Sequence, residues 1–152
     1  MPPLPLLPPV LDDPDTGPFF RAAGEGRLVV RVCDDCDQSL HLPRVRCFAC
    51  GSFDTSWHEV AGRGRIYTWT VVEHQVHPTF PTPFTAILVE LDDRPDVRLA
   101  GHLAGRPEIG AGTPVEVRFD RLDDDHALPG WQLLDDTDGD RSSGTPATRS
   151  IP

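Results

Sequence analysis

The sequence is poor in basic residues and contains no long apolar run. Only 14 lysine and arginine residues stand against 24 acidic ones, and the formal net charge is −10. Such a surface repels phosphate backbones, which disfavours general nucleic-acid binding. No run of about 18 apolar residues occurs, and the proline-broken stretch PLPLLPPVL lacks the basic flank of a secretory signal. We therefore expect a cytoplasmic protein with neither a nucleic-acid nor a membrane partner.

Signatures of catalysis are also missing. There is no G-x-S-x-G turn, no glycine-rich phosphate loop with a lysine, and no pair of histidines at helical i, i+4 spacing. His74 and His77 fall at the end of an expected strand, where we interpret them as solvated loop residues without a catalytic role. The acidic stretches DRLDDDH and LLDDTDGD are typical of solvated loops rather than of an acid/base pair. We expect no catalytic site in this chain.

The composition of the chain differs between its two ends and its middle. The 17 prolines and 13 glycines predict many turns. We expect an extended Pro-rich arm over residues 1–14, a short helix and lead-in strand over 15–30, and a disordered acidic tail over 135–152. Asp15 or Thr16 is expected to cap the helix, before glycines end it.

The middle of the chain alternates between strand patterns and turn residues. The strand patterns are RLVVRVC, TSWHEV, RIYTWTVVEH, TAILVELDD, VRLAGHLA and TPVEVRFDRL, with a last short one in PGWQLLDD. Glycines at 62 and 64 predict a bend, and no helical periodicity lies between the later strands. The chain is therefore mainly β, with a five-stranded, small closed β-barrel over 59–134 rather than a βαβ sheet.

Four cysteines between the expected helix and barrel form two matched pairs. Cys33 and Cys36 enclose two residues, as do Cys47 and Cys50, and ten residues separate the pairs. Each spacing lets a tight turn aim two sulfurs inward, and two such turns build a tetrahedral site that suits Zn²⁺ or a single iron. Four thiolates leave no open position for substrate. The segment 31–58 is thus expected to hold a structural metal and to perform no chemistry.

Other interpretations of the quartet fit less well. Disulfides need an oxidising compartment, which nothing in the sequence indicates. A redox pair needs a βαβ setting and one pair only. An iron-sulfur cluster and an emptied, degenerate site stay open as alternatives to structural zinc. Gly51 suits the left-handed turn after the second pair, whereas Asp37 follows the first pair and predicts a less regular first knuckle.

Several motifs in order resemble a known family. They are the paired knuckles, the Leu42-Pro43-Arg44 stretch, the Gly62/Gly64 bend, the YTWT strand, the PF before TAILVELDD, and the IG before a valine-rich strand. Over about residues 19–134 this pattern is similar to acyl-CoA-associated proteins of the domain-of-unknown-function 35 type. The resemblance implies a short N-terminal helix, a rubredoxin-like zinc ribbon and an OB-fold barrel, with structural Zn²⁺ as the only cofactor.

The same resemblance implies a function. Such proteins are non-catalytic companions of thiolase-fold enzymes, including lipid-transfer-protein-type thiolases and aldolases that cleave side chains of steroid-CoA thioesters. The ribbon and helix are expected to dock on the thiolase-like subunit in a hetero-oligomer. The OB-fold is expected to guide the CoA moiety of a steroid or fatty acyl-CoA, or to act as a spacer.

Eight residues are candidates for these contacts. Arginines on an acidic protein suit CoA phosphates or an acidic partner, and aromatics on a small ribbon with little core of its own often lie at interfaces. Ordinary solubility and packing between ribbon and barrel explain the same residues equally well. The candidates are Arg44, Arg46, Arg63, Arg65, Phe19, Phe20, Phe48 and Trp57.

A nucleic-acid-binding module is the alternative function, because zinc ribbons and OB-folds both commonly bind single strands. The acidic charge counts against it. So does the strand RIYTWTVVEH, which supplies Tyr67 and Trp69 but ends on an acidic residue.

Overall fold

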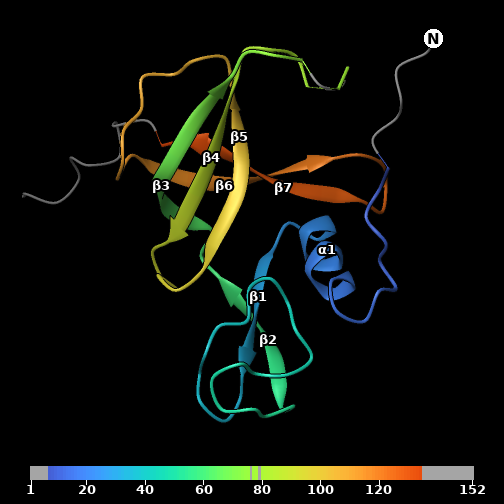
Figure 1. Cartoon of the computed structure of the whole chain (residues 1–152). Helices are drawn as coiled ribbons and strands as arrows, with labels where there is room; N and C mark the ends of the chain where they lie inside the picture. The colour runs from blue at the N-terminus through green and yellow to red at the C-terminus, as the bar shows by residue number, and fades with distance from the viewer. Residues whose placement is uncertain (1–6, 76, 79, 135–152) are drawn as a thin grey trace, which may run out of the picture.

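Strands are the main regular secondary structure of the protein. The computed structural model describes residues 7–75, 77–78 and 80–134 (Figure 1). Residues 1–6 of the expected arm and all of the expected tail lie outside this range. Within it, no helix is long and apolar enough to cross a membrane. The elements are α1 (Gly17–Gly24), β1 (Leu28–Cys33), β2 (Thr55–Val60), β3 (Arg63–Val72), β4 (Phe84–Leu91), β5 (Arg98–Ala104), β6 (Pro114–Arg121) and β7 (Ala127–Leu133).

The turn before helix α1 is held by a residue that the sequence analysis did not select. Thr16 occupies the N-cap position, but its side chain makes no capping hydrogen bond. Instead, the Asp13 carboxylate accepts hydrogen bonds from the backbone N–H groups of Thr16 (2.7 Å) and Asp15 (3.0 Å). The bond from the Thr16 amide is the main cause that lowers the pKa of Asp13. The prediction that Asp15 or Thr16 caps the helix is confirmed for the position of Thr16 but not for a capping hydrogen bond from its side chain, and the helix ends at Gly24 as expected.

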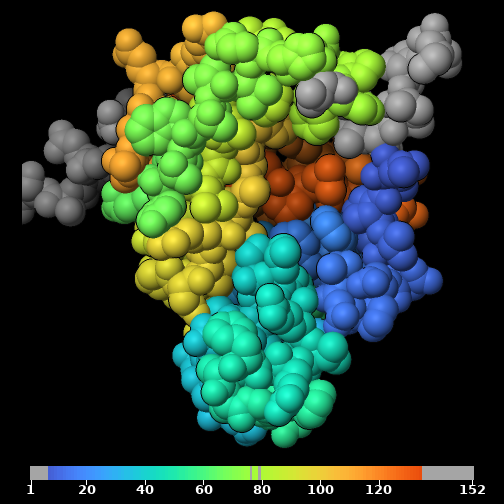
Figure 2. All heavy atoms as spheres, in the orientation of Figure 1, coloured from blue at the N-terminus to red at the C-terminus, as the bar shows by residue number. Residues whose placement is uncertain are grey.

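A two-stranded antiparallel sheet of β1 and β2 carries the cysteine loops. Cys33, the last residue of β1, lies opposite Thr55, the first residue of β2. Strand β1 is buried along almost its whole length, because one side faces the barrel and the other faces helix α1. The cysteine loops form a lobe below the barrel (Figure 2). This is the ribbon that the knuckle spacing predicts.

The larger sheet has the strand order β5-β4-β3-β6-β7. Long strand β3 pairs with β4 over most of its length but with β6 only at residues 63–65. The predicted bend before β3 requires glycine. A Cβ on Gly62, whose φ is +70°, would lie 2.4 Å from the Val117 side chain, and one on Gly64 would lie 2.4 Å from the Glu90 carbonyl oxygen.

Trp131 brings the two edges of this sheet together. It belongs to β7, is only 1% exposed, and lies against Gly101 of β5. A Cβ on Gly101 would lie 2.2 Å from Trp131 Cδ1, so the indole fills the space that a side chain would need. Strands β5 and β7 thereby come into contact and the sheet curls into a barrel. The mainly β fold, with a short helix, a four-cysteine zinc ribbon and a five-stranded OB-fold, is confirmed.

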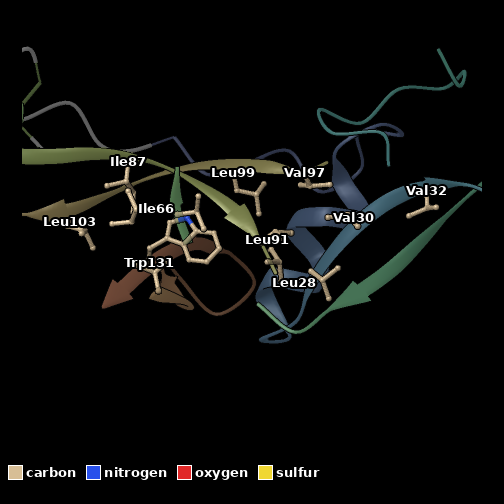
Figure 3. Packing of buried hydrophobic residues seen from close by; sticks show 13 residues of the cluster. Leu28, Val30, Val32, Ile66, Ile87, Leu91, Val97, Leu99, Leu103 and Trp131 are labelled. Carbon is tan, nitrogen blue, oxygen red and sulfur yellow. The ribbon is translucent and has the colours of Figure 1, made fainter. Parts of the chain in front are cut away.

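One hydrophobic core joins the ribbon to the barrel. Leu28 and Val30 of β1 belong to the same buried cluster as Leu91 and Leu99 of the barrel, and so does Val97, on the loop between β4 and β5 (Figure 3). Because the buried apolar cluster is continuous between the two parts, the ribbon packs directly against the barrel and is not a separate module on a linker.

Candidate metal centre and its surroundings

The four cysteine sulfurs lie together at the far end of the ribbon. The Sγ atoms of Cys33 and Cys50 are 3.6 Å apart, those of Cys36 and Cys47 are also 3.6 Å apart, and all four lie within 4.8 Å of one another. None of the four forms a disulfide. A tetrahedron with Zn–S bonds of about 2.3 Å has edges of about 3.8 Å. The donor set and its spacing therefore fit a closed, four-thiolate metal site.

Both knuckles have the same backbone geometry. In the first, the amide of Asp37 donates to the Cys33 carbonyl oxygen at 2.9 Å. In the second, the amide of Gly51 donates to the Cys47 carbonyl oxygen at 3.0 Å. Asp37 adopts φ +58° and Gly51 φ +82°, and both lie in the left-handed region. The sequence predicts a less regular first knuckle, but Asp37 accepts the turn without loss of its hydrogen bond.

The metal-free thiols differ in acidity. The backbone amide of Cys50 is the main cause that lowers the pKa of Cys47 to about 6. The backbone amide of Gln38 is the largest single influence on Cys36, and it lowers the pKa of that thiol. The neighbouring thiols, led by Cys50, and burial oppose it, and together they raise the pKa of Cys36 to about 12. Since a metal binds the thiolate form, loading of this site releases protons near neutral pH.

The barrel contacts the first knuckle. On the turn between β4 and β5, Arg94 donates from Nη1 to Asp37 Oδ2 and from Nη2 to Asp37 Oδ1, both at 3.0 Å. Two residues further on, Asp96 accepts hydrogen bonds from the Ser39 amide at 3.2 Å and the Ser39 hydroxyl at 3.1 Å. Gln38 Nε2 also donates to Asp96, at 3.1 Å. The residues directly after Cys36 are therefore fixed to the barrel.

The second knuckle faces outward and carries exposed apolar side chains. Val45 is 58% exposed, Phe48 64% and Phe53 69%. Arg46 holds this region by donating from Nε to the Gly51 carbonyl oxygen at 2.9 Å, and its guanidinium lies 5.7 Å from the centre of the Phe53 ring. We call Val45, Arg46, Phe48 and Phe53 the second-knuckle surface. The sequence does not single out Phe53 as a contact residue. Its position three residues after Cys50 is the one local feature that could have indicated it.

The remaining contact candidates lie on other elements. Arg44 is exposed close to the second-knuckle surface, while Arg63 and Arg65 are exposed at the start of β3. Arg65 Nε lies 3.6 Å from an Asp92 carboxylate oxygen. Trp57, on β2, is half-buried, and the Arg31 guanidinium lies 5.9 Å from the centre of its ring.

The helix aromatics line a groove at the junction of helix, ribbon and barrel. Phe19 packs against the hydrophobic core and lies 5.2 Å from Phe20, centre to centre. Both line an open groove of about 490 Å³, together with His41, Leu88, Arg98 and Leu99. Burial lowers the pKa of His41. The groove collects residues that are far apart in the sequence, so no local pattern predicts it.

The two histidines at the end of β3 are placed apart from the cysteines. His74 is exposed just beyond Val72, where β3 ends. The ring of His77 lies 6.2 Å from that of Phe80, in the loop that leads to β4.

Fold and site together define a class, the zinc-ribbon proteins with a C-terminal OB-fold barrel. Residues 20–56 match the family model for the ChsH2 rubredoxin-like zinc ribbon domain, and residues 57–120 match that for the ChsH2 C-terminal OB-fold domain. The chain belongs to this ChsH2 family of DUF35-type proteins.

Individual relatives agree with the family. A solved structure described as an Ltp2-ChsH2(DUF35) aldolase contains a chain that is 35% identical, with a TM-score of 0.71, over 80% of this chain and 95% of that one. A DUF35 protein of unknown function from Sulfolobus solfataricus shares the fold at 13% identity and a TM-score of 0.53, over 68% of this chain and 77% of that one.

A curated relative extends well beyond the region of similarity. A probable enoyl-CoA hydratase alpha subunit from Thermomonospora curvata is 37% identical over 117 residues, or 76% of this chain. The chain spans only 36% of that relative's length.

Proposed function

We propose that this protein is a non-catalytic accessory subunit of a thiolase-like acyl-CoA enzyme, with the ribbon as docking module and the barrel as CoA guide or spacer. The observation that carries the proposal is the 35% identity to nearly the whole of a chain in the structure described as an Ltp2-ChsH2(DUF35) aldolase, together with the match to both ChsH2 domain models. The proposed partner is a thiolase or an aldolase of the lipid-transfer-protein type. The link to steroid or fatty acyl-CoA degradation stays a prediction.

The same proposal assigns Zn²⁺ to the four cysteines as a structural ion. The ligands are Cys33, Cys36, Cys47 and Cys50, and the ion would hold the two knuckles against each other. Four protein ligands complete a tetrahedral shell, so the ion would contribute shape and no Lewis-acid chemistry.

The second-knuckle surface is the part of the ribbon best suited to a partner. Exposed Phe48 and Phe53 beside Arg46 combine the aromatic and arginine side chains that often dominate binding energy at interfaces. The first knuckle is already in contact with the barrel through Asp37 and Ser39. The second knuckle faces away from these contacts and leaves its apolar side chains available to another protein.

Co-purification tests the proposal. The protein is co-expressed with a lipid-transfer-protein-type aldolase and, separately, with a thiolase, and the pairs are compared by size-exclusion chromatography and by enzyme assay. We expect one partner to co-elute and to lose stability or activity when this chain is omitted. Separate elution at micromolar concentration, with unchanged partner activity, would contradict the proposal.

Matched variants locate the docking surface. Phe48→Ala removes an exposed aromatic ring from the second knuckle, and Trp69→Ala removes one that is 41% exposed on the barrel. If the second knuckle docks, Phe48→Ala weakens partner binding by roughly 30-fold, as expected for a hot spot of about 2 kcal/mol. Trp69→Ala then binds almost as wild type. The opposite ranking would place the partner on the barrel.

A further inference from the structure

The two knuckles differ in what supports them, although their backbones are alike. Among the described residues, the second is braced from within the ribbon, by the hydrogen bond from Arg46 Nε to the Gly51 carbonyl oxygen and by the bond from the Cys47 amide to the Ser52 carbonyl oxygen. The first is braced by Arg94 and Asp96, which follow it by 57 residues in the sequence. This asymmetry is visible only in the tertiary structure.

We propose that Arg94 and Asp96 are positioning residues of the metal centre, and that they couple metal binding to the packing of the ribbon against the barrel. The inference rests on the proposed metal, but it does not depend on the identity of the partner enzyme. It concerns residues of the barrel, to which the cysteine pattern assigns no part in the metal site.

The contacts form a two-point clamp on the segment after Cys36. Arg94 binds both carboxylate oxygens of Asp37 and also donates to its carbonyl oxygen at 3.3 Å. Asp96 binds the backbone and hydroxyl of Ser39, which is only 4% exposed. A two-pronged arginine–carboxylate contact fixes direction as well as distance, and here it fixes the residue that closes the knuckle turn.

The clamp reaches the ligands through the backbone. The Asp37 amide donates to the Cys33 carbonyl oxygen at 2.9 Å, and the Cys33 amide donates to the Gln38 carbonyl oxygen at 3.0 Å. Residues 37 to 39 are thus bonded to Cys33 on one side and to the barrel turn on the other. Outer partners of this kind orient metal ligands, and their loss typically lowers metal affinity about 10–100-fold.

The barrel end of the clamp is itself rigid. Val97, next to Asp96, is fully buried in the core shared by ribbon and barrel. Its amide donates to the Arg94 carbonyl oxygen at 2.9 Å, and the Leu91 amide donates to the Val97 carbonyl oxygen at 3.2 Å. Because the turn between β4 and β5 is held in this way, its side chains hold the first knuckle in one geometry. By linkage, a metal that orders the knuckle in turn stabilises the contact with the barrel.

Asp37 thereby acquires a role that glycine has no means to fill. Glycine would adopt the left-handed turn at lower cost, but it offers no side chain to Arg94. Aspartate is among the few other residues that tolerate this conformation, and its short carboxylate reaches the barrel. Aspartate at this position therefore exchanges a small backbone cost for a contact between the two parts of the protein.

Metal affinity measured on the full chain tests the clamp. Co²⁺ is titrated into metal-free protein and followed by thiolate-to-cobalt absorption, and Zn²⁺ affinity is obtained by competition. We expect Arg94→Ala and Asp37→Asn to weaken binding about 10-fold or more. Arg94→Lys keeps the charge but loses the two-pronged contact, so we expect it to behave like Arg94→Ala. Arg106→Ala removes an equally charged residue that pairs with Glu73 far from the ribbon, and we expect wild-type affinity.

Each outcome decides a different point. Variants within twofold of wild-type affinity would overturn the clamp and leave the zinc assignment intact, and so would equal losses in Arg106→Ala. Wild-type affinity in Arg94→Lys would show that charge alone acts, and would also overturn it. A wild type that binds neither Co²⁺ nor Zn²⁺ would overturn the zinc assignment and the clamp together.

Hydrogen exchange gives a readout that is independent of affinity. We expect removal of metal from the wild type to speed exchange both in peptides that contain Ser39 and in peptides from the turn 92–97. In Asp37→Asn, the barrel turn should no longer respond to the metal. If the barrel turn of the wild type exchanges at the same rate with and without metal, the two parts are not coupled and the inference is wrong. Circular dichroism checks that each variant is folded.

Discussion

Replacement of Gly101 by alanine would test how the barrel closes. The added methyl group would start 2.2 Å from Trp131 Cδ1 and 2.9 Å from Trp131 Nε1, well inside the contact distance of about 3.5–4 Å between carbon atoms. Trp131 is 1% exposed and is packed in the core, so it has little freedom to withdraw. We therefore expect overpacking and a displaced indole.

The expected loss of stability follows from two opposing effects. Overpacking of a core costs roughly 1–3 kcal/mol, and the very short approach at Gly101 favours the upper half of this range. Alanine in place of glycine stabilises the folded state by about 0.5–1 kcal/mol, because it restricts the unfolded chain more than glycine does. A net loss of about 1–2.5 kcal/mol lowers the midpoint of thermal unfolding by roughly 2–10 °C in a protein of this size.

Thermal unfolding followed by circular dichroism is a suitable assay, with Gly110→Ala as the matched control. A Cβ on Gly110 would have no atom within 4 Å, so this variant should unfold at the wild-type temperature or slightly above it. Combination of Gly101→Ala with Trp131→Phe should cost less than the sum of the single changes, since the smaller ring leaves room. Equal unfolding temperatures for Gly101→Ala, Gly110→Ala and wild type would refute this account of closure.

Three further predictions concern the metal, pH and nucleic acid. Cys47→Ser should reduce bound zinc from one ion per chain to near zero by elemental analysis, whereas a fully loaded variant would show that Cys47 is not a ligand. Burial lowers the pKa of His41 below its ordinary 6.5, so the unfolded chain binds the proton more readily than the folded chain does. The wild type should therefore lose stability as the pH falls below 6.5. The His41→Gln variant should lose less stability over the same pH range, as measured by chemical unfolding at each pH. With a formal charge of −10, the protein should flow through a single-stranded DNA column at low salt, and retention would favour the nucleic-acid alternative.

Predictions that depended on neighbouring residues were accurate in most cases. The two-residue spacing of each cysteine pair indicated a knuckle, and alternation in RLVVRVC indicated the strand that ends at Cys33. The capping hydrogen bond is the exception. Thr16 occupies the N-cap position, but its side chain makes no capping bond, and Asp13 instead accepts from the amides of Asp15 and Thr16 in the turn before the helix. The order of the four residues within Asp12 to Thr16 that are capable of capping does not show this division.

The sequence by itself determined the element types, the pairing of the four cysteines in two knuckles and the family resemblance, because these depend on period, spacing and residue chemistry over short stretches. Tertiary structure alone decided that Trp131 fills the space beside Gly101, and that Arg94 holds Asp37. It also decided that one knuckle faces the barrel while the other carries exposed Phe48. These contacts join residues that are distant in sequence, and they exist only after the sheet has curled and the ribbon has packed on the shared core.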